Sequence, residues 1–290
     1  MTAPVRRRPR PPVAGAPPVR RRPRWSTPVT TVPTAPETVQ PTRRLLGVEL
    51  LTVLGLSLGA SGIGALISFT GSLTETLKLG QQVATLNGSR APGRPWLDLV
   101  WQLYYIGRGL MPVVLVGYLL VREGVSLRVL GFDLGQKLRD LGRGAAVAAA
   151  IGGSGLVLYL GSQAAGYNLT VAPSGLPDVW WRIPVLVLSA WQNAILEEVV
   201  VLGYLLRRVT QLGWTWPAAL AASALLRGSY HLYQGVGGLV GNIVMGVVFC
   251  LLYRRWGRVM PLVVAHALID TVAFVGYALL AGHVSWLPTG

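Results

Sequence analysis

The chain has 290 residues, of which 52% are hydrophobic and 13% are charged. Its mean hydropathy of +0.50 excludes an ordinary soluble globular protein, and apolar runs of about the 20 residues needed to cross a bilayer recur along it. Because the one cysteine, Cys250, lies inside such a run, a disulfide framework and a cysteine metal site are also excluded. The composition predicts an all-α polytopic transmembrane helix bundle.

The net charge of +15 at pH 7 is concentrated near the N-terminus. Arginine blocks such as Arg6-Arg7-Arg8 alternate with proline over residues 1–43, which contain few large aliphatic side chains. Such a segment cannot bury enough surface to fold, so we expect a disordered tail. It lacks the apolar region of a signal peptide and should be retained. Because a membrane bundle follows this segment, we expect its arginines to bind anionic membrane lipid, and we expect no nucleic-acid partner.

Seven apolar segments follow, and we expect each to cross the membrane. They divide the chain into two transmembrane helices in 44–123, an amphipathic cytoplasmic linker in 124–143, further helices in 144–282 and an outer tail in 283–290. The brevity of 239–253 predicts a shallow hairpin with its neighbour. The segments are 45–73, 97–121, 144–161, 181–206, 215–231, 239–253 and 259–281.

The loops indicate an orientation in the cell membrane. Arginine and lysine are dense before the first segment, in 122–143 and just after the fourth and sixth segments, whereas 162–180 and 232–238 contain none. Cytoplasmic loops are enriched in these residues, which predicts a cytoplasmic N-terminus and an outer C-terminus. The loop at 74–96 contains basic residues on the outer side and is ambiguous.

The fourth segment contains two adjacent carboxylates, Glu197 and Glu198, within an apolar run. A charged group at the centre of a membrane helix costs roughly 2.5 to 3.5 kcal/mol on insertion scales, so both acids need partners. Neighbours on an α-helix point about 100° apart, so the two acids cannot have the same role.

Other polar side chains occur in the same segment and the three that follow. Ionisable groups in membrane helices usually face the bundle interior and pair, so we expect these four helices to meet at one polar pocket. Residues four apart share a helix face, which pairs Asn193 with Glu197, Arg227 with His231, and His266 with Asp270. The residues are Asn193, Arg227, His231, Asn242, His266 and Asp270.

Imidazoles and carboxylates around a wet pocket are typical of a hydrolase. A desolvated glutamate is suited to take a proton from water near neutral pH, and a histidine can share that work. Other polar groups can stabilise an oxyanion. The same set could instead bind a divalent metal such as Zn²⁺ through Glu197, His231 and His266, so whether a cofactor is present stays open. Asn193 and Asn242 are expected to support the helix packing.

The order of these residues resembles the CPBP family, which contains CAAX-type prenyl endopeptidases and the Abi membrane proteins. That family has a Glu-Glu-x-x-x-Arg motif, then Phe-x-x-x-His, then His-x-x-x-Asn or His-x-x-x-Asp. Here Glu197-Glu198, His231 and His266-x-x-x-Asp270 match, within residues 181–280. The resemblance implies that Glu197 and His231 activate water, and that His266 and Asp270 bind or position the oxyanion.

Two positions depart from the family pattern. Leu202 replaces the motif arginine, and Arg227 replaces the motif phenylalanine. Because Arg227 shares a face with His231, its guanidinium could reach Glu198 from another helix and restore the missing ion pair. Alternatively, Leu202 marks an inactive relative.

The resemblance implies an intramembrane endopeptidase that hydrolyses a peptide or protein substrate. The alternative is a non-catalytic scaffold or immunity-type membrane protein whose polar cluster holds the helices together. A transporter is a weaker third reading, because ions also bind in polar pockets at membrane depth.

Overall fold

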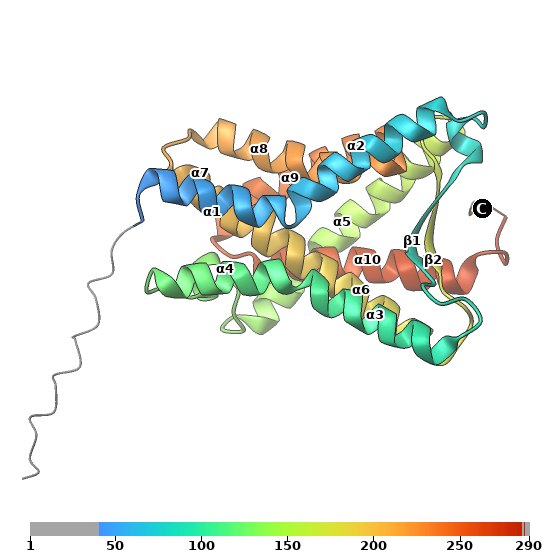
Figure 1. The fold of residues 1–290 in the computed structure, drawn as a ribbon, viewed down its shortest axis with the longest axis horizontal. Coiled ribbons are helices and arrows are strands. Elements are labelled where there is room, and N and C mark those ends of the chain that lie inside the picture. The colour runs from blue at the N-terminus through green and yellow to red at the C-terminus, as the bar shows by residue number, and fades with distance from the viewer. Residues whose placement is uncertain (1–40, 286, 288–290) are drawn as a thin grey trace, which may run out of the picture. The chain divides into compact units, whose positions relative to one another are not determined.

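The computed structural model describes residues 41–285 and 287, so nearly all of the predicted tail over 1–43 lies outside the described residues. The described part is an all-α bundle with one small sheet (Figure 1). Its elements are α1 (Arg43–Gly55), α2 (Leu58–Thr74), β1 (Val83–Gly88), α3 (Pro95–Gly109), α4 (Met111–Arg122), α5 (Lys137–Ala164), β2 (Thr170–Gly175), α6 (Arg182–Glu197), a π-helical segment (Glu198–Tyr204), α7 (Leu205–Gln211), α8 (Trp216–Ser229), α9 (Val236–Trp256) and α10 (Met260–Leu280).

Five helical stretches in the described residues are long and apolar enough to cross a membrane, and the bent pair α1–α2 adds a sixth if it counts as one span. The expected span at 215–231 is instead α8, whose 14 residues reach only about 21 Å at 1.5 Å per residue. The segment expected to be short, 239–253, belongs to the 21-residue α9. In the helical hairpin of α8 and α9, the shorter helix is therefore α8. The five stretches are Pro95–Arg122, Lys137–Ala164, Arg182–Gln211, Val236–Trp256 and Met260–Leu280.

The segment predicted as a surface linker, 124–143, is partly helix, because α5 begins at Lys137 rather than near 144. Arg258 explains the early start, since it binds Asp140 in the first turn of α5 at 2.7 Å and Asp133 in the preceding loop at 3.0 Å. These hydrogen bonds also lower the pKa of the Asp133 carboxyl below its usual value. The cluster fixes the start of α5 against the α9–α10 turn.

The stretch from α6 through the π-helical segment to α7 forms the centre of the bundle. Every residue from Glu197 to Leu206 is buried, in contact with side chains of α1, α4 and α10. At the far end of this stretch, Arg208 is fully buried and pairs with Glu49 of α1 and with Glu123, which follows α4. A fully buried cation requires such partners, so this cluster fixes the position of α7.

Glycines allow α8 to approach its neighbours closely. A Cβ atom on Gly228 would lie 2.9 Å from the Leu239 carbonyl oxygen of α9, and one on Gly246 would lie 2.9 Å from the Ala224 Cα. On the other side of α8, a Cβ on Gly62 of α2 would lie 2.6 Å from Ser229 Oγ. The C-terminal end of α8 is therefore held between α2 and α9.

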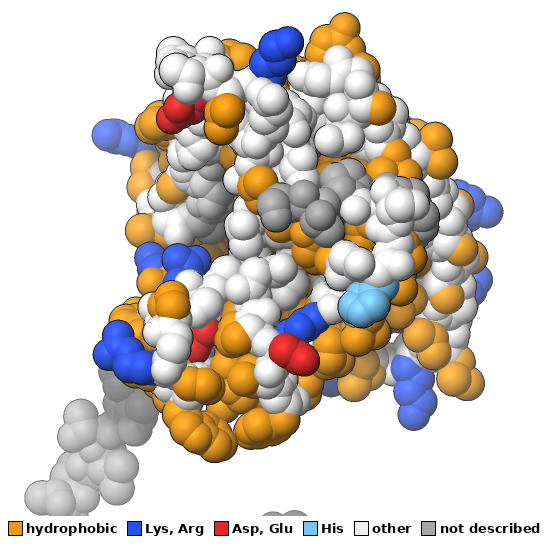
Figure 2. Space-filling model, turned by 90° about the vertical axis from the view of Figure 1, so that its right-hand side faces the viewer, with side chains coloured by type: hydrophobic (Ala, Val, Ile, Leu, Met, Phe, Trp, Pro, Cys, Tyr) orange, Lys and Arg blue, Asp and Glu red, His pale blue; other side chains and the backbone are white. Residues whose placement is uncertain are grey.

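Two short strands cross one end of the helices (Figure 1). β1 and β2 pair in parallel, with Val83 opposite Thr170 and Gly88 opposite Gly175. Figure 2 views this end, where hydrophobic side chains mix with backbone and uncharged polar atoms and charged side chains are few. Sequence reasoning missed this sheet and assigned both segments to loops.

Candidate active site

Glu197 and Glu198 lie where α6 changes into the π-helical segment. In this segment the Leu205 N–H donates to the Val200 carbonyl, five residues back. That pairing leaves the Val201 carbonyl without its α-helical donor, and the buried Ser223 hydroxyl of α8 donates to it at 3.0 Å. Such π-helical turns are frequently found at functional sites.

Glu198 is fully buried and bound to two other helices. Its Oε1 accepts from Arg227 Nη2 at 2.6 Å and lies 2.8 Å from His266 Nδ1. The ion pair that the sequence suggested between Arg227 and Glu198 is therefore present. The guanidinium also lies 5.2 Å from the centre of the Phe249 ring, so Arg227 is held on two sides.

Glu197 has different partners and 7% exposure. Its Oε2 accepts from the Tyr230 hydroxyl at 2.8 Å and lies 3.3 Å from Arg227 Nη1. Sequence reasoning did not select Tyr230, because a tyrosine near a helix end is common at a membrane interface. Its position directly before a site histidine was the available signal.

His231 follows the C-terminal end of α8 and is half-buried. Its Nδ1 lies 3.0 Å from the Arg227 carbonyl oxygen, which can only accept, so we assign the proton of the neutral ring to Nδ1. Nε2 then has a free lone pair. The ring centre lies 4.9 Å from that of Tyr230, which places the imidazole beside the residue that binds Glu197.

His266 and Asp270 lie one turn apart on α10, with Nε2 and the nearer carboxylate oxygen 3.6 Å apart. This distance exceeds a hydrogen bond, so the Nε2 side is open to another acceptor. The Asn193 side chain of α6 lies beside the Asp270 carboxylate. Asn242 instead donates to the Gly238 carbonyl of its own helix at 3.0 Å, and no contact links its side chain to the two glutamates within the described residues.

A metal centre was the other expectation for these residues. Within the described residues, one oxygen each from Glu197 and Glu198 and one His266 nitrogen lie within 4.8 Å of one another. The set contains Glu198 where sequence reasoning placed His231. Both carboxylates already contact the Arg227 guanidinium, so a divalent cation among them would face a fixed positive charge. The donor set therefore does not fit a metal ion.

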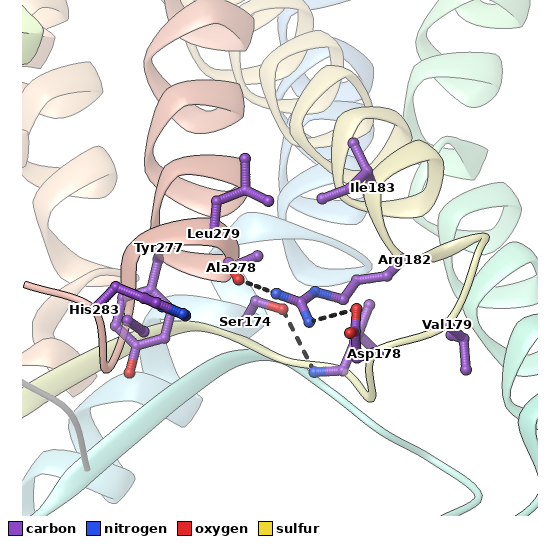
Figure 3. Close-up of a pocket in the computed structure, with 11 residues that line it drawn as sticks. Ser174, Asp178, Val179, Arg182, Ile183, Tyr277, Ala278, Leu279 and His283 are labelled. Atoms are coloured by element: carbon purple, nitrogen blue, oxygen red, sulfur yellow. Dashed lines mark hydrogen bonds and ion pairs between the residues drawn. The ribbon is translucent and has the colours of Figure 1, made fainter.

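Two hollows lie near the end crossed by the strands. One of about 480 Å³ lies between α6 and α10, where Arg182 binds Asp178 and the Ala278 carbonyl (Figure 3). None of the predicted site residues lines it. The other, of about 460 Å³, is lined by α2, β1 and residues that include Tyr230. Tyr230, which binds Glu197, is the residue that this second hollow shares with the carboxylate cluster.

Residues 179–272 match the family model described as type II CAAX prenyl endopeptidase Rce1-like. The matched range covers about a third of the chain and contains Glu197, Glu198, His231 and His266. No curated protein and no solved structure is detectably similar to the chain.

Proposed function

We propose, from the premise that residues 179–272 are an Rce1-like domain of the type II CAAX prenyl endopeptidase family, that this chain hydrolyses a peptide bond with a water molecule activated by Glu197 and His231. The family supports a CAAX-type protease activity within the membrane. The observation that carries the proposed mechanism is the meeting of Glu197, Tyr230 and Arg227 in one buried cluster beside His231.

In the proposed first step, Glu197 takes a proton from water while the oxygen attacks the carbonyl carbon of the scissile peptide bond. The Tyr230 hydroxyl holds the carboxylate in place. His231 accepts a hydrogen bond from the same water at Nε2, because Nδ1 donates to the Arg227 carbonyl. A base positioned in this way typically accelerates a reaction by about 10² to 10⁴.

The attack converts the carbonyl oxygen into an oxyanion. We propose that His266 carries a proton on both ring nitrogens, so that Nδ1 donates to Glu198 and Nε2 donates to the oxyanion, with Asp270 orienting the ring. Donors fixed in advance stabilise such charge at no reorganisation cost. The C–N bond then breaks, and protonated Glu197 returns its proton to the leaving amine. Water is consumed, and a carboxylic acid and an amine are formed.

Glu198 and Arg227 are proposed as positioning residues. Glu198 holds His266 through Nδ1, and Arg227 neutralises Glu198 and supplies the carbonyl that orients His231. In this chain the guanidinium comes from α8, whereas the family motif places it at the position of Leu202. That substitution keeps the ion pair, which favours an active enzyme over an inactive relative.

We further propose the topology and the extent of the parts. The distribution of basic residues favours a cytoplasmic N-terminus and an outer C-terminus. The catalytic core is proposed to span 181–280, following the helices of residues 44–123. The protease family implies a peptide or protein substrate, and we propose anionic lipid as the partner of the basic residues before α1.

The test uses purified full-length protein in proteoliposomes, with farnesylated CAAX peptides and an unprenylated peptide library, and detects products by mass spectrometry. Glu197→Gln should lower cleavage at least about 100-fold while the protein still folds. Asp178→Asn makes the same chemical change on a side chain that is 98% exposed and should cleave normally. Absence of cleavage by the wild type, together with loss of folding in Glu197→Gln, would support the scaffold reading instead.

A further inference from the structure

The second hollow is lined by residues of β1, and one edge of this strand is covered by no other strand in the described residues. The Thr170 N–H of β2 donates to the Gln82 carbonyl at 2.9 Å, and Thr170 is the register partner of Val83. In a parallel ladder alternate residues face the partner strand, so Gln82 and Ala84 face β2. The backbone N–H and C=O groups of Val83 and Thr85 therefore point to the opposite, unpaired edge.

Another part of the lining is a polar face of α2. Ser61, Ala65, Ser68 and Ser72 line the hollow and recur at helical spacing. The hydroxyls of Ser68 and Ser72 have no hydrogen-bond partner among the described residues. A lipid chain would gain nothing from hydroxyls and strand amides, whereas a peptide backbone can bond to both.

Tyr230, whose hydroxyl binds Glu197, is among the residues that line the hollow. A segment lying in the hollow would therefore contact the residue that holds the proposed base. The volume of about 460 Å³ is within the usual range for bound ligands.

We propose that the segment to be cleaved docks as an additional strand on the free edge of β1, facing the serines of α2. This proposal rests on the proposed function and specifies the conformation of its substrate. Strand addition supplies affinity through main-chain hydrogen bonds. It also presents an extended backbone, in which the carbonyl is not engaged in a helix and is open to attack. A substrate that is helical at the cleavage site would first have to unwind.

The kinetic test replaces Thr85 by proline. Proline removes the N–H that points to the free edge and leaves the β2-facing groups of Gln82 and Ala84 in place, and edge strands tolerate it. With the farnesylated CAAX peptide in proteoliposomes, KM should rise about three- to tenfold, the loss expected for one hydrogen bond, while kcat changes little. A wild-type KM in Thr85→Pro would overturn the docking proposal alone. Failure of the wild-type protein to cleave would instead overturn the proposed function.

A second test does not depend on turnover. In the Glu197→Gln background, and with a mild oxidant added to accept the two electrons and two protons, Thr85→Cys should form a disulfide with a farnesylated CAAX peptide that contains an added cysteine, whereas Asp178→Cys, on an exposed loop, should not. Cys250 is fully buried and does not compete. Equal cross-linking at both positions, or none at Thr85→Cys, would contradict the proposal.

Discussion

Removing the Arg227 guanidinium should be one of the most destabilising single changes in the chain. The side chain is 1% exposed and contacts Glu198 at 2.6 Å and Glu197 at 3.3 Å. Arg227→Met keeps the apolar stem but leaves Glu198, which is fully buried, with His266 as its single partner. Breaking a buried pair in this way typically costs about 3 to 5 kcal/mol. We expect a loss of that size in unfolding of the purified protein in mixed micelles.

A double-mutant cycle tests the reason for that loss. Glu198→Gln removes the negative charge that Arg227→Met leaves unpaired. The double variant should therefore be more stable than the sum of the two single losses predicts. The coupling free energy should be about 1 to 3 kcal/mol. A full charge swap should rescue less, because an arginine at 198 would face His266. Coupling below about 0.5 kcal/mol, the usual error for independent sites, would refute the view that the ion pair stabilises the bundle.

Three further outcomes follow from the contacts. Tyr230→Phe should lower activity about tenfold or more and destabilise the fold by about 1.5 to 3 kcal/mol, because Glu197 loses a charge-assisted hydrogen bond; kcat and thermal unfolding measure the two effects. Prolonged dialysis against a chelator should leave cleavage unchanged, because Arg227 already occupies the carboxylates, and activity that is lost and then restored by Zn²⁺ would contradict this. Asp133→Asn should make the free energy of unfolding decrease less as the pH is lowered into the acid range. Arg258 lowers the pKa of Asp133 in the folded state, so its stabilisation is complete above the unfolded value of 3.8 and declines as the pH falls below it toward the folded value. If the free energy of unfolding of this variant depended on acid pH as in the wild type, Asp133 would contribute nothing to stability.

The polar cluster was predictable because charged side chains in apolar helices need partners. Arg227 pairs with Glu198 from another helix, as the sequence led us to expect, whereas the contact between His266 and Glu198 was not expected. The direct donor to Glu197 was not predictable, because helical spacing identifies residues on one helix face and gives no information about which hydroxyl on another helix approaches it. Asn242, expected to support the helix packing, donates to the backbone of its own helix.

The strands were missed for a different reason. Their sequences, VATLNG and TVAPSG, contain glycine, asparagine or proline, and neither shows a strong alternating pattern. Each is stabilised by a partner distant in the chain, and such a long-range pairing leaves no local signal. The expected span at 215–231 was also wrong, because α8 has an apolar composition but only 14 residues.

The π-helical turn affects how the chain tolerates changes in length. Ordinary α-helix advances by 100° and 1.5 Å per residue. A π-helical turn holds about one residue more than an α-helical turn, because its N–H groups donate to the carbonyl five residues back instead of four. Deleting one residue among Val199, Val200 and Val201 should therefore let a regular helix form while Arg208 still points toward Glu49 and Glu123. The same deletion within α7, ahead of Arg208, would rotate the two acids relative to Arg208 by about 100°, so the wide turn is the place where this helix can lose a residue.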